Sequence, residues 1–224
     1  MKSDISILST TMELIKSIST LPIMESFYTL QGEGFHQGRA AYFIRLGGCD
    51  VGCVWCDVKE SWDADAHPKF SVEEIVEKAL TSVNRQPSTV NRHLAVITGG
   101  EPLMHNLDQL TTQLQAAGFE TNIETSGSSP FSGKWDWICL SPKKFKQPLP
   151  EILPLANELK VVVFNKSDFD WAEEYASKVS SHCKLYLQPE WDKASAVTPL
   201  IIEYIKQNPQ WQLSLQIHKY INVP

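Results

Sequence analysis

Three cysteines lie within eight residues of one another in the segment GGCDVGCVWCD, at Cys49, Cys53 and Cys56. A structural zinc site normally takes four protein ligands, and the two remaining cysteines, Cys139 and Cys183, lie far along the chain. Three thiolates at this spacing would hold a [4Fe–4S] cluster and leave one iron open to a small molecule, which suits chemistry better than scaffolding. Spacing alone leaves three interpretations open: such a cluster, zinc with a distant fourth ligand, or buried thiols without a metal.

Four other polar motifs each follow a short apolar run. They are GGEP at 99–102, TSG at 125–127, SPK at 141–143 and QPEW at 188–191. Each motif alone is typical of a turn. If the apolar runs are parallel strands, these motifs and the cysteine segment all lie at carboxyl ends of strands, where sheets and barrels of this type build their active sites. The five segments together therefore predict one site.

The elements that would position this site alternate between strands and helices. Apolar, β-branched or aromatic runs predict strands over residues 40–46, 93–98, 120–125, 135–140, 158–164 and 184–188, with 211–216 as a candidate last strand. Amphipathic runs predict helices over residues 71–83, 106–118, 168–180 and 195–209. Ser71 and Asn106 are the predicted N-caps, Gly118 is a predicted stop, and Pro199 falls in an early turn.

The number of strands limits the fold. Six or seven strands with fewer helices fall short of a full eightfold barrel of about 250 residues. We therefore expect an α/β fold, an incomplete, TIM-like β/α barrel of about six parallel strands, with an open doubly wound sheet as the alternative. Residues 23–224 would form one domain that includes the C-terminal tail. Residues 1–22 would be an N-terminal extension, in which Met12 is an alternative start to Met1.

Composition excludes several classes of protein. Hydrophobic residues make up 42% of the 224 residues and charged residues 21%, as in globular proteins and unlike disordered chains. The net charge of −6 argues against binding to nucleic acid. No apolar run approaches the ~20 residues that a membrane span needs, and the N-terminus does not resemble a signal peptide. Crowded cysteines make a disulfide framework implausible, so we expect a reducing compartment, the cytoplasm.

The motifs together resemble a known superfamily. Cysteines separated by three and then two residues, Trp55 before the last of them, and TGGEP after the next predicted strand resemble the radical S-adenosylmethionine (radical SAM) enzymes. The segments FYTLQGEGFHQGRAAYFIRLGGCDVGCVWCD, ETSG, LSPK, LQPEW and QIHKYINVP resemble the 7-carboxy-7-deazaguanine synthases, the ring-contracting enzymes of queuosine and 7-deazapurine biosynthesis. This resemblance runs from Ile23 to Pro224, nearly the whole chain.

The resemblance implies a reaction and its cofactors. The three cysteines would hold a [4Fe–4S] cluster whose open iron is chelated by S-adenosyl-L-methionine. One electron would cleave that cofactor, and the resulting radical would take a hydrogen from C6 of 6-carboxy-5,6,7,8-tetrahydropterin. The ring would then contract and lose ammonia to give 7-carboxy-7-deazaguanine. The resemblance also implies a homodimer and an electron donor such as flavodoxin.

The resemblance further implies two sets of site residues. Those around the cofactor would be Trp55, Gly99, Gly100, Glu101, Ser126, Ser141, Pro142, Lys143, Gln188, Pro189, Glu190 and Trp191. Those around the pterin would be Leu30, Gln31, Gly32, Glu33, Arg45, Thr98, His218 and the terminal carboxylate of Pro224. Arg45 interrupts an apolar strand, so it would either clamp the substrate carboxylate with His218 or form a structural salt bridge.

One position departs from the pattern. Magnesium-binding members of the family place a hydroxyl residue, usually Thr, two positions after the last cysteine, and here that residue is Val58. Valine cannot ligate a hard cation. Magnesium (Mg2+) is therefore either absent or held by substrate, cofactor and waters with Asp57, Lys59 or another nearby group, and the sequence does not locate it.

Two alternative functions stay open at this stage. A glycyl-radical activase of the same superfamily would share the three-cysteine segment and the barrel, but would dock a protein in place of a pterin. A zinc-binding interaction module would need Cys139 or Cys183 to complete the metal site.

Overall fold

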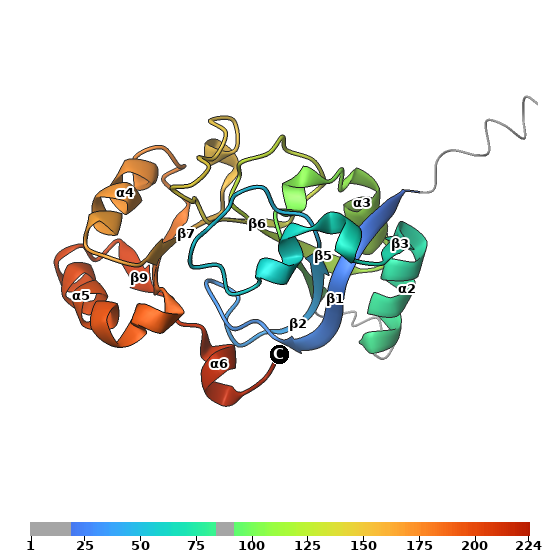
Figure 1. Ribbon diagram of the computed structural model, residues 1–224, viewed down its shortest axis with the longest axis horizontal. Coiled ribbons are helices and arrows are strands. Elements are labelled where there is room, and N and C mark those ends of the chain that lie inside the picture. The colour runs from blue at the N-terminus through green and yellow to red at the C-terminus, as the bar shows by residue number, and fades with distance from the viewer. Residues whose placement is uncertain (1–18, 84–91) are drawn as a thin grey trace, which may run out of the picture.

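The computed structural model describes residues 19–83 and 92–224, and its centre is one curved sheet of nine strands in the order β3-β1-β2-β4-β5-β6-β7-β8-β9 (Figure 1). The strands are β1 (Thr20–Leu30), β2 (Ala40–Leu46), β3 (Lys69–Ser71), β4 (His93–Gly99), β5 (Phe119–Thr125), β6 (Trp137–Leu140), β7 (Glu158–Val163), β8 (Lys184–Pro189) and β9 (Trp211–Leu213). The seven strands β2 and β4 to β9 are parallel and correspond to the six predicted strands and the candidate last strand. Within the described residues no pairing joins β9 to β3, so the barrel is incomplete, as expected.

Helices cover the outside of the sheet (Figure 1). They are α2 (Val72–Ser82), α3 (Asp108–Ala116), α4 (Ser167–Ala176), α5 (Ala194–Gln207) and α6 (Ile217–Ile221). Short 3-10 helices occupy several connections, at η1 (Lys59–Trp62), η2 (Ala64–Ala66), η3 (Pro102–Met104), η4 (Leu153–Leu155) and η5 (Trp191–Lys193). Among the helices of the described residues, none combines the length and apolar character needed to cross a bilayer.

The four predicted helices are present with small shifts at their ends. Ser71 caps α2 through a reciprocal pair of bonds with Glu74, as its sequence predicts. Asn106 accepts a hydrogen bond from the Asp108 amide, but the N-cap of α3 is Leu107, one residue later than predicted. Gly118 follows α3 with a φ of +90°, a conformation that ends helices. The short helix α6 was not predicted.

Strands β1 and β3 were also not predicted, and they shift the N-terminal boundary of the domain. β1 is largely half-exposed and carries a register irregularity between Ile23 and Glu25, so its hydrophobic pattern is weak. It begins at Thr20, and Leu21 is buried in the core. The sheet therefore starts three residues before the predicted boundary at position 23, and residues 1–18 of the predicted extension lie outside the described residues.

Alternation along the parallel strands separates two faces of the sheet. One face packs against the helices through residues such as Ile44, Ile97 and Val161, which belong to the main core. The opposite face points into the barrel and carries polar side chains within otherwise apolar strands. These are Arg45 on β2, Thr98 on β4, Glu124 on β5, Lys160 on β7 and Gln188 on β8. Because side chains of a strand alternate between its two faces, five strands deliver these polar groups to one interior.

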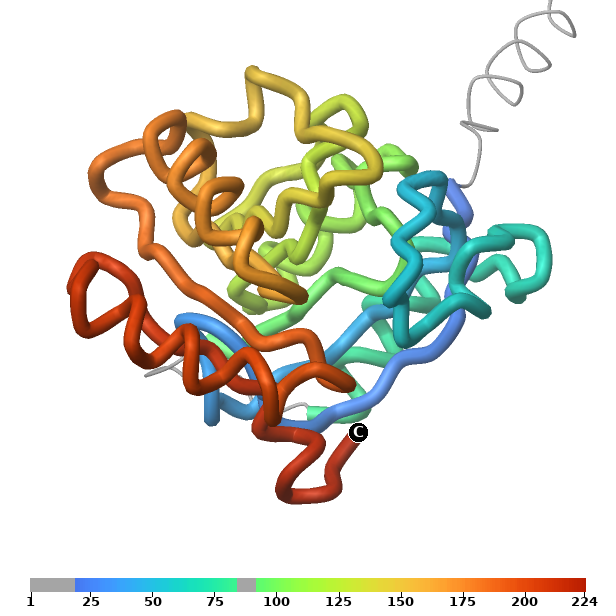
Figure 2. Tube along the Cα trace, turned by 60° about the vertical axis from the view of Figure 1, so that its left-hand side comes forward, coloured from blue at the N-terminus to red at the C-terminus, as the bar shows by residue number. Residues whose placement is uncertain are grey.

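The loop between β1 and β2 and the C-terminal tail complete the interior. The Gly34 amide donates to Ser214 Oγ (3.0 Å), just after β9, and the Phe35 amide donates to Glu158 at the start of β7 (3.2 Å). The Ile217 amide donates to the Gly32 carbonyl (3.0 Å), which joins the tail to this loop. Figure 2 shows the tail running between the β9 end and the β1 end of the sheet. The tail therefore covers the gap that the strands leave open.

Candidate active site

One cavity inside the barrel contains almost every predicted site residue. All of the predicted cofactor and substrate residues line it except Pro142, and the three clustered cysteines line it as well. We call the part of the lining formed by the cysteines and the SPK and QPEW motifs the cysteine end. We call the part formed by the mutually hydrogen-bonded or ion-paired residues Gln31, Glu33, Glu124, Lys160 and Gln216 the carboxylate end. The polar motifs at the carboxyl ends of the strands thus share one site.

The cysteine segment is anchored by its flanking backbone. The Gly48 amide donates to the Ser61 carbonyl (2.6 Å) and the Cys49 amide to the Trp62 carbonyl (3.1 Å), which closes the segment into a loop ending at η1. His105 bonds the Gly47 carbonyl through its ring nitrogen (2.8 Å). The loop is therefore held at its base while the three thiols face the cavity.

The thiols of this loop suit a metal centre that supplies positive charge. Burial raises the pKa of Cys53 to about 11, against a nearby Lys143, and burial also raises the pKa of Cys49. Because thiolates are the form that ligates metals, these groups need the charge of a cluster to ionise. Cys139 and Cys183 do not line the cavity. No three His, Cys, Asp or Glu side chains of the described residues converge as a single zinc ion requires.

Glycines 99 and 100 serve packing between loops. A Cβ at Gly100 would lie 2.1 Å from the Gly48 carbonyl oxygen, and a Cβ at Gly99 would lie 2.4 Å from the backbone of Leu46. The GGEP motif thus lies directly against the base of the cysteine loop. Side chains at these two positions would therefore clash within the fold itself, in addition to any space that a cofactor beside Gly99 and Gly100 would need.

Glu101 connects the motifs that follow β4 and β5. Its buried carboxylate accepts hydrogen bonds from the Ser126 amide (2.8 Å), the Leu103 amide (3.1 Å) and the hydroxyls of Thr125 and Ser126. A carboxylate has about four acceptor sites, so these hydrogen bonds use most of its capacity and fix its position. Glu101 therefore orders the cavity wall, whatever else it contacts.

The SPK and QPEW motifs complete the cysteine end. The Lys143 ammonium lies beside Ser141 Oγ and 5.4 Å from the centre of the Trp55 ring. Burial lowers the pKa of Lys143, and Lys160 adds to this shift, while Cys53, Cys139 and Glu33 oppose it. Gln188 accepts a hydrogen bond from Ser214 Oγ (2.9 Å). Glu190 caps η5 by accepting from the Lys193 amide (3.0 Å).

The carboxylate end is a closed network of charges. Lys160 donates to Glu33 in a close contact and lies 3.6 Å from Glu124. Gln216 donates to Glu33 (2.9 Å), and Gln31 donates to Glu124 (2.8 Å). Burial opposes ionisation of Glu33, but attraction to Lys160 and the hydrogen bonds outweigh it and lower the carboxyl pKa to about 2. Glu33 is therefore an ionised acceptor on the cavity wall.

Arg45 and His218 stand on the same cavity. One guanidinium nitrogen of Arg45 pairs with Glu25 (3.0 Å), while its buried Nε has no partner within the described residues. The predicted salt bridge is thus present, and donor capacity remains for a ligand. The His218 ring lies against Gly32, and burial lowers its pKa although Glu33 opposes the shift. Pro224, the last residue, also lines the cavity.

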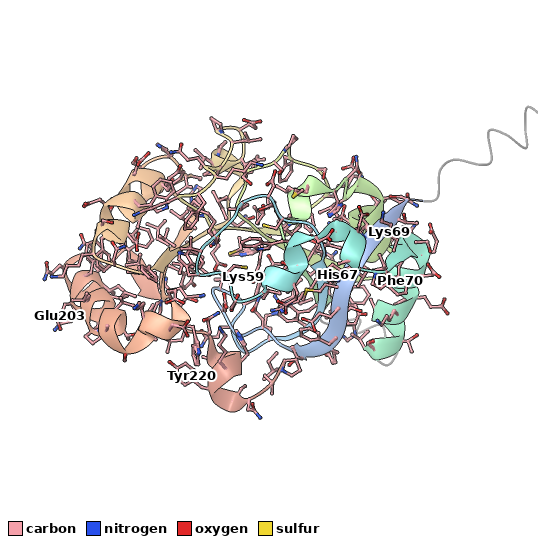
Figure 3. The ribbon with its side chains drawn as sticks, viewed as in Figure 1. Lys59, His67, Lys69, Phe70, Glu203 and Tyr220 are labelled. Carbon is pink, nitrogen blue, oxygen red and sulfur yellow. The ribbon has the colours of Figure 1, made fainter. Side chains whose placement is uncertain are left out.

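The three residues that follow the last cysteine decide whether the protein itself offers a ligand to magnesium. Val58 lines the cavity and presents no oxygen from its side chain. Asp57 lines the cavity and pairs with Lys219 of α6 (3.0 Å). Lys59, on η1 (Figure 3), does not line it. Lys219 also lies 4.8 Å from the centre of the Trp191 ring, so the tail contacts both the cysteine loop and QPEW.

Three residues of the carboxylate end were not predicted from the sequence: Glu124, Lys160 and Gln216. A usable signal was available for two of them. Lys160 and Glu158 are charged residues in the otherwise apolar strand β7, as Arg45 is in β2, and a charge in a buried strand needs a partner. Glu124 is likewise an acidic residue inside a strand. Gln216 carried no signal, because its role depends on a tail conformation that no periodic pattern reports.

Comparison with known proteins agrees with this geometry. Residues 30–182 match the family described as a 4Fe-4S single cluster domain. The 7-carboxy-7-deazaguanine synthase of Flavobacterium psychrophilum is 53% identical over 91% of this chain and 93% of its own length. The protein of the same name from Synechocystis is 52% identical over 90% and 93%. The crystal structure of QueE from Escherichia coli matches with a TM-score of 0.73 and 35% identity over 88% of this chain and 93% of that one. The chain belongs to the 7-carboxy-7-deazaguanine synthase family.

Proposed function

We propose that this protein is a radical SAM enzyme that converts 6-carboxy-5,6,7,8-tetrahydropterin into 7-carboxy-7-deazaguanine with loss of ammonia, a carbon–nitrogen lyase of queuosine and 7-deazapurine biosynthesis. One observation carries the proposal. A single cavity is lined by three cysteine thiols at one end and by paired donors and acceptors at the other. An activase acting on a protein partner has no need of the enclosed carboxylate end. The family of the chain supports the same choice.

At the cysteine end, the chain holds and orients its cofactors. Cys49, Cys53 and Cys56 would ligate a [4Fe–4S] cluster, which with bound S-adenosyl-L-methionine supplies the abstraction of a hydrogen atom. Lys143 stands next to Trp55 and Ser141, where its ammonium would meet anionic groups of the cofactor. Ser126 and Gln188 line the same wall. These side chains bind, orient and exclude water.

At the carboxylate end, the chain recognises the pterin. Glu33 and Gln31 would accept from and donate to the edge of the ring, and Thr98 would add a hydroxyl. Arg45 and His218 would bind the substrate carboxylate, since a guanidinium suits that geometry. The terminal carboxylate of Pro224 would meet ring N–H donors. The aromatic side chains of Phe27 and Phe43 stack 5.5 Å apart and give the cavity an apolar wall.

Four further features belong to the proposal. Magnesium is held, where it binds at all, by substrate, cofactor and water, because Val58 offers no ligand. An electron donor such as flavodoxin reduces the cluster, and the enzyme is a homodimer; both rest on the family resemblance. The enzyme works in the cytoplasm, since five free cysteines, three of them in a metal-binding loop, require a reducing compartment.

The experiment is an anaerobic assay of the reconstituted protein. With the carboxylated tetrahydropterin, S-adenosyl-L-methionine and a reductant, mass spectrometry should detect 7-carboxy-7-deazaguanine and ammonia should be released in equal amount. The protein should be brown and carry about four irons per chain. Bound zinc in place of iron, or cofactor cleavage without any ring-contracted product, would contradict the proposal. Size-exclusion chromatography with light scattering tests the homodimer separately.

A further inference from the structure

A lysine buried at the carboxylate end has no role in the function proposed so far. Lys160 lies on β7 between Leu159 and Val161, which both face the helix side of the sheet. Its own side chain therefore points into the barrel, lines the cavity and is only 4% exposed. A lysine this deeply buried requires compensation, because an uncompensated ammonium would be costly.

The compensation comes from two carboxylates on separate elements. Glu33 belongs to the loop after β1, and Glu124 belongs to β5. Lys160 contacts the first closely and lies 3.6 Å from the second. Two half-buried carboxylates facing one cavity would repel each other, which favours uptake of a proton by one of them. The ammonium between them removes that outcome, so the cavity presents two ionised acceptors at once.

We propose that Lys160 is a positioning residue for the substrate, which holds Glu33 and Glu124 as a fixed pair of ionised acceptors for the N–H donors of the pterin ring. This inference rests on the proposed function. A carboxylate has about four acceptor directions, and the protein uses only some of them on each residue. Lysine has donors and no acceptor, so it does not compete for the N–H groups of the ring. A bicyclic ligand without those donors would bury the remaining acceptor directions of both carboxylates without a hydrogen bond and be rejected.

Several other charged or titratable groups face this cluster. Glu158 of β7 and Cys139 of β6 act on Lys160, and His218 acts on Glu33. Lys143 and Arg45 act at longer range. Burial lowers the pKa of Lys160, but Glu124 and Glu33 outweigh it and raise that pKa well above its ordinary value. Lys160 therefore stays protonated at every working pH and is unsuited to be a general acid.

Removing the Lys160 ammonium should raise the pKa of Glu33. Attraction to Lys160 is the largest influence that lowers the pKa of Glu33, and burial is the influence that raises it. In Lys160→Met, burial dominates, so the shared site retains a proton at neutral pH. Pterin affinity should then be weak at low pH and recover as the pH rises and the carboxylate ionises. In the wild type, with Glu33 at about 2, no such recovery occurs.

The experiment measures binding of 6-carboxypterin, a fluorescent aromatic analogue, from about pH 5 to about pH 8 in wild type and Lys160→Met. The ratio of the two Kd values cancels titration of the ligand and of groups that do not interact with this cluster. The ratio should be about ten- to a hundredfold at the acid end and fall at least tenfold toward the alkaline end. Lys160→Arg, which keeps the charge, should give a ratio that does not vary with pH.

Val161→Ala is the matched control, since it weakens packing on the same strand from the helix side. It should lower the melting temperature and leave the pH dependence of binding unchanged. A pH-independent ratio for Lys160→Met would overturn the proposal and make Lys160 merely structural. If Lys160→Met does not fold, adding Glu33→Gln removes one charge of each sign and should restore folding; failure to do so would also count against the proposal.

The two proposals fail differently. The protein could bind 6-carboxypterin with the predicted pH dependence of the Kd ratio and still form no ring-contracted product in the anaerobic assay. That result would contradict the proposed function but support the role of Lys160 in pterin binding. Product formation by the wild type together with a Kd ratio that does not vary with pH would support the proposed function and contradict the role of Lys160. No binding of the analogue by the wild type would contradict both.

Discussion

Two lysines that line the same cavity, the half-buried Lys143 and the buried Lys160, have opposite surroundings. Lys160 has two carboxylates beside it, and its pKa is raised. Lys143 has a serine hydroxyl and an aromatic ring, and burial lowers its pKa. At the carboxylate end, one ammonium and the hydrogen bonds from Gln31 and Gln216 stabilise both carboxylates within the protein itself. At the cysteine end, the thiols and the Lys143 ammonium have no such partners of opposite charge beside them among the described residues, and a bound cofactor would supply those charges.

This difference indicates that the two ends are prepared in different ways. Interactions fixed before a ligand arrives cost no reorganisation on binding, and the carboxylate end has that character. The cysteine end is shaped by backbone bonds around the loop, while its charges await the bound groups. Variants should thus separate the ends: damage at one should spare binding at the other.

The largest difference between the effects on the two ends should come from substituting the loop cysteines. Cys49→Ala, Cys53→Ala and Cys56→Ala should each lose the cluster and all measurable turnover, because each removes one of three ligands. Binding of 6-carboxypterin should change by less than about threefold, since the carboxylate end is unaffected. Iron content, product formation and fluorescence titration measure the three quantities.

Cys139→Ala and Cys183→Ala are the matched controls, because both thiols are buried and lie off the cavity. They should retain iron and turnover. Loss of iron in either control to the extent seen for the loop cysteines would show that the open three-ligand site is wrong.

The next largest effect should come from the chain terminus. A C-terminal affinity tag moves the carboxylate of Pro224 away from the pterin without touching the cysteine loop. A charge-assisted hydrogen bond is worth roughly 1.5 to 3 kcal/mol, so the pterin KM should rise about tenfold to a hundredfold. Iron content and uncoupled cofactor cleavage should stay nearly constant. The same tag placed at the N-terminus is the control, and equal kcat/KM for both tagged forms would make the terminus a bystander.

A smaller effect should follow from the ion pair that links the two ends. Lys219 on α6 and Asp57 beside the last cysteine are 3.0 Å apart, and Asp57 is largely exposed. Exposed pairs contribute about 0.2 to 1 kcal/mol, so Lys219→Met should raise the pterin KM about two- to fivefold, and less at high salt. A double-mutant cycle with Asp57→Asn isolates the pair. An additive cycle would mean that the contact does not couple the ends.

The smallest effect should be the response to magnesium. Because Val58 supplies no oxygen ligand, adding magnesium to metal-stripped enzyme should change kcat/KM by less than about twofold. Val58→Thr should create a clear stimulation, whereas Val58→Ala, which removes bulk without adding oxygen, should not. A strict magnesium requirement in the wild type would show that another group has taken the place of the threonine.

Much of the cysteine end could be predicted from the sequence because its residues are local. Cys49, Cys53 and Cys56 share one loop, and the motifs that meet them each follow a strand whose hydrophobic pattern is strong. Parallel strands then bring their carboxyl ends together without further information. The seven parallel strands and the covering helices were predictable for the same reason.

The carboxylate end was harder to predict from the sequence, because its residues come from distant parts of the chain and meet only in the tertiary structure. Glu33 and Gln216 are brought together by a loop inside the barrel and by a tail segment, neither of which has a periodic pattern. β1 was missed because its irregular register and half-exposed face weaken the alternation that marks a strand. Family resemblance supplied Gln31 and Pro224, but it supplied neither Lys160 nor Glu124.

The bond between the Ile217 amide and the Gly32 carbonyl has a consequence for biosynthesis of the protein. This hydrogen bond joins the loop after β1, which is synthesised early, to the C-terminal tail, which is synthesised late. Chains emerge from the ribosome N-terminal end first, at about 5 to 20 residues per second. The cysteine loop and its neighbouring strands can therefore form while the tail is still unsynthesised, whereas the wall that Gln216 and His218 contribute to the cavity forms only once the tail has been made. If these residues bind the pterin as proposed, loss of the tail should leave a protein that holds its cluster but no longer selects its substrate.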